Sequence, residues 1–261
     1  MDIIASRKKE ISKLVPVLMI FMATATLMIQ VVDLQAQGTF SLRQVSWPSG
    51  TPLFRIESTS DARYLRTAVG IIYDGKVWHL EDHPVPYHDI DTGPDSGELP
   101  RLPLSAAQLA RGHRDFNRGI LNKVSTIDDP RYLELPPNIS ERVKDLARRI
   151  TEGMPTPFEK AKAIETFLQA KYKYKLDFTP APPDREAHDW FLFESKEGTC
   201  SHFNSAFVIL TRASGIPSRL AIGYLIRPGE GEQVVYAHQA HAWAEVGFEG
   251  LGWIVFEATP P

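Results

Sequence analysis

The chain of 261 residues contains only one cysteine, Cys200. A single cysteine cannot form a disulfide within the chain, so the sequence excludes a disulfide framework and leaves the redox compartment undecided. An excess of one charge is also missing, since 29 Lys and Arg residues stand against 32 Asp and Glu residues and the net charge is -3. This balance does not create the basic surface that nucleic acid requires, and we expect no nucleic-acid partner.

Charged residues are absent from residues 14–32, close to the N-terminus. An uncharged helix of this length just crosses a bilayer core about 30 Å thick. By the positive-inside rule, the basic residues before the span keep the N-terminus cytoplasmic, and everything after Asp33 is exported. These basic residues are Arg7, Lys8, Lys9 and Lys13. We therefore expect residues 1–35 to anchor the protein in a membrane, with a catalytic domain on the extracytoplasmic side.

A cleaved signal peptide is the alternative interpretation of residues 1–35. Two features favour the anchor. The uncharged span is longer than the apolar region of a typical signal peptide, and Leu34-Gln35-Ala36 does not fit the small-x-small pattern of a cleavage site.

The segment after the span has the period-two pattern of β-strands. Leu53–Ser58 and Tyr64–Tyr73 show this alternation most clearly, and Asp74-Gly75 directly after the second segment predicts a two-residue hairpin turn. Pro, Asp and Gly then concentrate over residues 82–105, which predicts a long loop. We expect a small β-rich domain that includes this linker loop over residues 38–125.

The second half of the chain changes to helical periodicity. One apolar face ends with Ile150 and predicts a helix that Gly153 terminates. Thr156-Pro157-Phe158-Glu159 is a capping box with proline at the first helical position, so a second helix is predicted to begin there. We expect both helices to pack beside a third helix, which begins at the only cysteine.

The third helix places the cysteine in its first turn. Thr199 is a suitable N-cap, apolar residues recur after it at helical spacing, and Gly215-Ile216-Pro217 predicts the end of the helix. In the first turn, unpaired backbone N–H groups and the helix dipole favour a thiolate, which lowers the pKa of a thiol from about 8.5 toward neutrality. Cys200 is therefore a candidate nucleophile, although a lone cysteine is also commonly a small buried apolar residue.

Residues 240–246 and 252–258 predict an antiparallel hairpin around a loop centred on Glu249. In this register His241 lies directly opposite Glu257, with Cβ atoms about 4.5–5.5 Å apart on one face of the sheet. A slip of one residue would send the two side chains to opposite faces. Cysteine, histidine and acid are the set of a thiol nucleophile, its general base and the group that orients the base.

A zinc site is a different interpretation of the same region, with Cys200, His202, His238 and His241 as ligands. The paired ligand spacing of structural zinc modules is missing, however. A thiolate and an imidazolium can also carry out acyl transfer without a Lewis acid. We expect no metal and no cofactor, with His202 in a packing or substrate-facing role and His238 at the rim of the site.

Four short blocks carry a resemblance to a known family. They are Gly198-x-Cys200-x-His202-Phe203, Gly215-Ile-Pro-x-Arg-x-x-x-Gly-Tyr224, His241-Ala-Trp-Ala-Glu-Val246 and Gly252-Trp-x-x-Phe-Glu-Ala-Thr-Pro260. On these blocks, the segment from about 131 to 261 resembles the transglutaminase-like superfamily, and more narrowly its membrane-anchored prokaryotic members. The resemblance implies a papain-like core with Cys200 as the nucleophile, His241 as the base and Glu257 at the position of the family's usual Asp.

These observations predict an α+β protein with three parts: an N-terminal transmembrane helix, a small β-rich domain, and a papain-like catalytic domain over residues 131–261. In the catalytic domain, helices pack on an antiparallel sheet. The resemblance implies thiol-dependent acyl transfer on protein or peptide amides, as a protease, deamidase or transglutaminase. The backbone N–H of Cys200 is the expected first oxyanion donor and Trp190 a candidate for the second. A catalytically inactive exported scaffold or binding module of the same fold is the alternative.

Overall fold

A computed structural model describes residues 38–43, 49–82, 99–105 and 108–261. The chain divides into two compact units, residues 1–39 and 40–261. The span at 14–32, for which a transmembrane helix is predicted, lies outside the described residues. Among the helices that the structure describes, none is long and apolar enough to cross a membrane.

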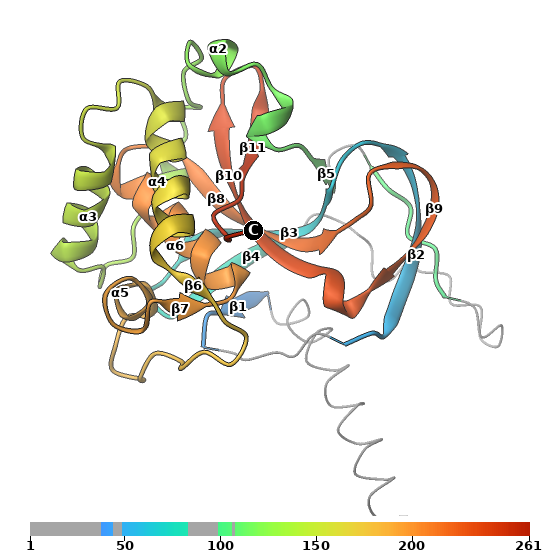
Figure 1. Cartoon of the computed structure of the whole chain (residues 1–261), viewed down its shortest axis with the longest axis horizontal. Coiled ribbons are helices and arrows are strands. Elements are labelled where there is room, and N and C mark those ends of the chain that lie inside the picture. Colours follow the sequence, from blue (N-terminus) through green and yellow to red (C-terminus); the bar gives the residue numbers. More distant parts are fainter. Residues whose placement is uncertain (1–37, 44–48, 83–98, 106–107) are drawn as a thin grey trace, which may run out of the picture. The chain divides into compact units, whose positions relative to one another are not determined.

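A sheet of seven strands lies at the centre of the part of the chain that the structure describes (Figure 1). The strand order is β1-β4-β3-β8-β10-β11, and the short β5 also pairs with β3. The bounds are β1 Thr39–Ser41, β3 Tyr64–Tyr73, β4 Val77–Asp82, β5 Leu109–Ala110, β8 Ser218–Leu225, β10 Ala240–Phe248 and β11 Gly252–Phe256. Every pairing from β4 through β11 is antiparallel, as predicted for the core.

Strand β3 joins the strands predicted for a separate β-rich domain to those predicted for the catalytic domain. It pairs with β4 on one side and with β8 on the other. Its residues 65–71 are all buried, which is typical of a central strand with both faces covered. The division into domains over 38–125 and 131–261 stays a prediction, and one sheet contains strands from both ranges. Alternating hydrophobicity identifies a strand, but it does not identify the strand's partner.

The predicted hairpin is present between β3 and β4, but Tyr73 pairs with Trp78, so its turn is centred on Gly75 and Lys76 and not on Asp74 and Gly75. Gly75 has a φ of +95°, a conformation that costs a glycine little. The Asp74 carboxylate accepts the backbone N–H groups of Lys76 and Val77 at 2.8 and 2.9 Å, which fixes the turn further.

A two-stranded antiparallel ribbon, β2 Pro52–Ser60 and β9 Gly229–Tyr236, lies beside the main sheet (Figure 1). Its apolar face forms a small buried cluster with the main sheet. In that cluster the ring of Phe54 meets the ring of Tyr224 edge to face, with centroids 5.3 Å apart.

The three predicted helices are present as α3 Glu141–Thr151, α4 Pro157–Lys171 and α6 Cys200–Ala213. The Thr156 hydroxyl accepts the backbone N–H of Glu159 at 3.1 Å, so the predicted cap of α4 is confirmed. Helix α6 packs on β8 and β10, and α3 and α4 pack on α6 (Figure 1). Phe203 and Phe207 of α6 are fully buried in the shared core, so the predicted packing of helices on an antiparallel sheet is confirmed.

The remaining elements are short and connect these layers. They are α2 Arg118–Leu121, α5 Ala187–Asp189, β6 Lys173–Tyr174, β7 Glu197–Gly198, the 3-10 turns His113–Asp115, Pro130–Tyr132 and Ala237–Gln239, and a π-helical turn at Trp190–Ser195. Strands β6 and β7 pair in parallel directly before the cysteine helix.

Candidate active site

Cys200 is the first residue of α6, and Thr199 is the N-cap. The ring of His202, two residues after Cys200, points back at this N-terminus, and its Nδ1 accepts the backbone N–H of Thr199 at 3.2 Å. The same ring packs edge to face on Phe178, with centroids 4.3 Å apart. Burial lowers the pKa of His202 to about 4, so the ring is neutral at pH 7. His202 is thus a packing residue that helps to cap the helix.

The hairpin of β10 and β11 has a register two residues away from the predicted one. Ala244 pairs with Phe256 and Phe248 pairs with Gly252, so the loop is centred on Gly250 and not on Glu249. His241 is therefore not directly opposite Glu257, which follows the last residue of β11. A shift of two residues preserves the alternation of faces, and for that reason the two side chains still meet.

The three predicted site residues lie together. Nε2 of His241 is 2.6 Å from Oε2 of Glu257. The thiol of Cys200 is hydrogen-bonded to the same imidazole. The backbone N–H of Ala242 also donates to this sulfur. The result is a continuous chain of hydrogen bonds from the thiol through the imidazole to the carboxylate.

The charges within this chain of hydrogen bonds stabilise one another. Burial alone would raise the pKa of the Cys200 thiol, but the charge and hydrogen bond of His241 outweigh burial and hold this pKa below its ordinary value. Burial alone would lower the pKa of His241, but the sulfur and then Glu257 raise it well above its ordinary value. Burial opposes ionisation of Glu257 too, yet the hydrogen bond from His241 keeps its pKa low. The arrangement favours a thiolate beside an imidazolium at neutral pH.

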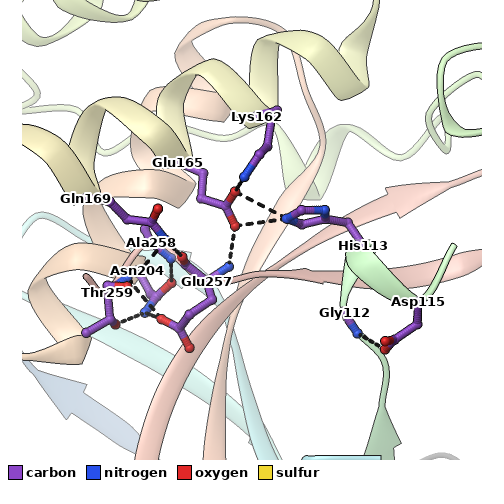
Figure 2. A network of polar contacts seen from close by, with 10 residues as sticks. All are labelled: Gly112, His113, Asp115, Lys162, Glu165, Gln169, Asn204, Glu257, Ala258 and Thr259. Atoms are coloured by element: carbon purple, nitrogen blue, oxygen red, sulfur yellow. Dashed lines mark hydrogen bonds and ion pairs between the residues drawn. The ribbon is translucent and has the colours of Figure 1, made fainter. Parts of the chain in front are cut away.

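The backbone of Glu257 is held by α4, which sequence reasoning did not predict. Oε1 of Glu165 accepts the Glu257 N–H at 3.0 Å, and Nε2 of Gln169 donates to the Glu257 carbonyl at 2.6 Å (Figure 2). Glu165 is only 1% exposed and is paired with His113 and Lys162. The sequence contains one signal for this contact with Glu257: a glutamate, Glu165, stands within the apolar stripe of α4, between Ile164 and Leu168.

Trp190 and His238 were also predicted to lie at the site, as a possible oxyanion donor and as a rim residue. The indole N–H of Trp190 donates to the carbonyl of Thr179 at 3.3 Å, so it is not directed at an oxyanion. His238 is exposed, and its ring stacks on Tyr236. Among the described residues, no three His, Cys, Asp or Glu side chains lie close enough together to hold a metal ion.

A second array of nucleophile, histidine and acid lies inside the core. Nε2 of His188 is 2.7 Å from the Ser205 hydroxyl, and Nδ1 is 2.8 Å from Oε1 of Glu186. The Ser205 hydroxyl also accepts the indole N–H of Trp78 at 2.6 Å. His188 and Ser205 are buried at 1% and 0% exposure. A substrate cannot reach this hydroxyl, so the array satisfies buried polar groups and stabilises the core.

The fold and the site both point to one class of protein. Residues 144–258 match the family model of the transglutaminase-like superfamily. The resemblance drawn from the four sequence blocks is therefore confirmed at the level of the superfamily.

Individual relatives agree with this assignment. YebA, an uncharacterized protein of Bacillus subtilis, is 38% identical over 138 residues, which cover 49% of this chain and 19% of YebA. A protein-glutamine gamma-glutamyltransferase of Pseudomonas aeruginosa is 29% identical over 133 residues, which cover 49% of this chain and 20% of that protein. This chain thus spans about a fifth of the length of these relatives.

A solved structure shares the fold over a longer part of the chain. The periplasmic domain of TgpA from Pseudomonas aeruginosa matches with a TM-score of 0.56 at 18% identity, over 85% of this chain and 92% of that one. The match covers more of the chain than the 115 residues of the family model at 144–258, so the fold likeness extends outside that range.

Proposed function

We propose that this protein catalyses thiol-dependent acyl transfer on amides of protein or peptide substrates. The observation that supports this proposal is the continuous chain of hydrogen bonds from Cys200 through His241 to Glu257, with the sulfur in the first turn of α6. The relatives named above add support for an enzyme, because one of them is named as a transferase.

The proposed reaction has two steps. The Cys200 sulfur attacks the amide carbonyl and a C–S bond forms, while the His241 imidazolium gives its proton to the nitrogen of the breaking C–N bond. The products of this step are a thioester on Cys200 and a free amine or ammonia. An acceptor then attacks the thioester, His241 takes the acceptor's proton, and the C–S bond breaks. Glu257 stabilises the imidazolium in both steps.

The side-chain amide of glutamine is the first acyl donor to test, because it is the donor in the name of the Pseudomonas aeruginosa relative. Water as the acceptor gives deamidation, and a lysine amine gives a crosslink. A peptide bond as the donor would make the protein a peptidase. All three outcomes use the same thioester chemistry.

An activity assay tests this proposal. The chain is incubated with a glutamine-containing protein and a fluorescent primary amine, and the release of ammonia, the release of peptide fragments and the incorporation of the amine are measured. We expect turnover by the wild-type chain and complete loss in Cys200→Ser and His241→Ala. A chain that releases neither ammonia nor peptide fragments and incorporates no amine, although it is folded, would support the alternative of an inactive scaffold.

We also propose that the protein is anchored in a membrane by residues 14–32, with the described residues on the extracytoplasmic side. The uncharged span and the basic residues that precede it support this location. Protease added outside intact cells should then digest the chain beyond Asp33. Complete protection of the chain in such cells would exclude this orientation.

A further inference from the structure

Asn204 is a buried polar residue one helical turn after Cys200 on α6, with 0% of its surface exposed. Its amide nitrogen lies 2.9–3.1 Å from four oxygens, and its amide oxygen accepts a backbone N–H at 3.0 Å. Figure 2 shows the contacts of Asn204 with Glu257, Ala258 and Thr259. The four oxygens are the carbonyls of Cys200 and Ala242, Oε1 of Glu257 and the hydroxyl of Thr259, and the N–H belongs to Ala258. Asn204 thus contacts all three chain segments that carry the proposed catalytic residues.

The two oxygens of the Glu257 carboxylate have different partners. Oε2 receives the hydrogen bond of His241 at 2.6 Å. Oε1 accepts the amide of Asn204 at 2.9 Å and the backbone N–H of Thr259 at 3.0 Å. A glutamate has one more rotatable bond than an aspartate, so a single contact with the imidazole orders it less completely. A second anchor on Oε1 fixes the carboxylate with Oε2 toward His241.

We propose that Asn204 is a positioning residue, which holds the Glu257 carboxylate against His241 and so stabilises the imidazolium of the proposed catalytic pair. This inference rests on the proposed function, because it assigns a role in the same site. The hydrogen bond from Asn204 is charge-assisted, since its acceptor is a carboxylate in a buried environment.

Asn204 accepts the N–H of Ala258 in the next peptide unit, but the backbone of Glu257 does not depend on Asn204 alone. Glu165 and Gln169 of α4 hold its N–H and its carbonyl, as described above. Removal of the Asn204 amide should therefore release the carboxylate while the backbone of residue 257 stays in place. For this reason the effect should appear in the titration of His241 rather than in a rearrangement of the strand.

Several titratable groups surround the Glu257 carboxylate and act on the same histidine. They are His241 of β10, Cys200 of α6, Glu165 of α4, Tyr64 of β3 and Tyr174 of β6. Asn204 itself carries no charge, so its removal leaves the number of charges at the site unchanged.

The test is an NMR pH titration of the imidazole of His241 in the full chain, with the signal assigned by its loss in His241→Ala. We expect the wild-type imidazolium to deprotonate well above the ordinary pH of about 6.5. Asn204→Ala should lower this midpoint by about one pH unit, and Glu257→Gln should lower it further. Asn204→Ala added to Glu257→Gln should produce no additional shift, because the carboxylate through which Asn204 acts is already gone.

Ser205→Ala is the matched control, since Ser205 is the next residue, is equally buried and bonds to Trp78 and His188 instead of the site. It should leave the midpoint unchanged. If Asn204→Ala does not fold, Asn204→Ser replaces it, because a serine hydroxyl can still bond to the carbonyl one turn earlier. The same downward shift is expected.

The outcomes separate this inference from the proposed function. A wild-type midpoint near 6.5 would contradict the thiolate–imidazolium pair itself. A high wild-type midpoint that Asn204→Ala leaves unchanged, or lowers equally with and without Glu257, would overturn the positioning role alone.

Discussion

At the scale of single residues, the proposed site contains a glutamate, Glu257, where the resemblance to the superfamily implies an aspartate. Glu257 begins just after the end of β11 and reaches His241 from a position that is not directly opposite it. The longer side chain spans this offset and still leaves one oxygen for Asn204. The longer side chain of Glu257 therefore compensates for the register of the hairpin.

Substitution of Glu257 tests this relation. Glu257→Gln should keep the fold but lower kcat roughly 10²-fold, because a neutral amide no longer stabilises the imidazolium. The loss is smaller than the roughly 10⁴-fold seen in strongly dependent triads, since the helix N-terminus also favours the thiolate. Glu257→Asp should lose about tenfold, because a shorter carboxylate cannot reach both His241 and Asn204. Steady-state kinetics with unfolding curves as a stability control measure these effects.

Wild-type turnover in Glu257→Ala would contradict this account of the site. It would show that a group other than Glu257 orients His241. Unchanged turnover in Glu257→Asp would show that the backbone can bring either carboxylate within reach.

At the scale of elements, a buried ion network joins three strands of the main sheet. Glu245 of β10 is 0% exposed and accepts hydrogen bonds from Arg66 of β3 and Arg219 of β8, at 2.6–2.9 Å. The indole of Trp243 donates to the same carboxylate at 3.0 Å. Burial alone would raise the pKa of Glu245, but the charges of Arg219 and Arg66 hold it below its ordinary value. The network therefore contains an ionised carboxylate.

Glu245→Gln should destabilise the fold by about 3–5 kcal/mol at pH 7, because two buried guanidinium groups lose their counter-charge. The folded-state pKa of Glu245 is lowered, so its stabilising contribution is complete above the unfolded value of about 4.3 and is lost as the pH falls through the folded value. Urea unfolding at several pH values measures this dependence. The exposed Glu249→Gln in the same hairpin is the control, and equal stability of the two variants at pH 7 would exclude a stabilising network.

The same hairpin shows why its register could not be predicted from sequence. Three glycines, at 247, 250 and 252, were available for the turn. Gly250 and Gly252 have positive φ and form it. Gly247 lies within β10, where a Cβ would meet Cδ1 of Ile127 at 2.5 Å, so this glycine is needed for packing. Whether a glycine forms the turn or allows close packing depends on the residues near it in space, and the sequence alone does not show these neighbours.

At the scale of the whole molecule, patterns of a few adjacent residues predicted where helices and strands begin and end. They did not predict which strands pair when the partners lie far apart in the sequence. The cap at Thr156, the hairpin of β3 and β4 and the helix that begins at Cys200 each depend on a few adjacent residues. The pairing of β3 with β8 joins residues at least 150 positions apart, and no local pattern encodes it. The same is true of Asn204 and Glu165, whose roles depend on neighbours from other elements.

The central claim is that the only cysteine is a pre-formed thiolate beside an imidazolium, and the pH dependence of its alkylation tests this most directly. Because Cys200 is the sole cysteine, the rate constant with iodoacetamide in the native chain reports this site alone. We expect the rate to be close to its plateau already at pH 6, and to fall at least about 100-fold at that pH in His241→Ala, since an ordinary thiol is less than about 1% ionised there. A wild-type thiol that reacts only after denaturation, or only with an ordinary pKa near 8.5, would contradict the account.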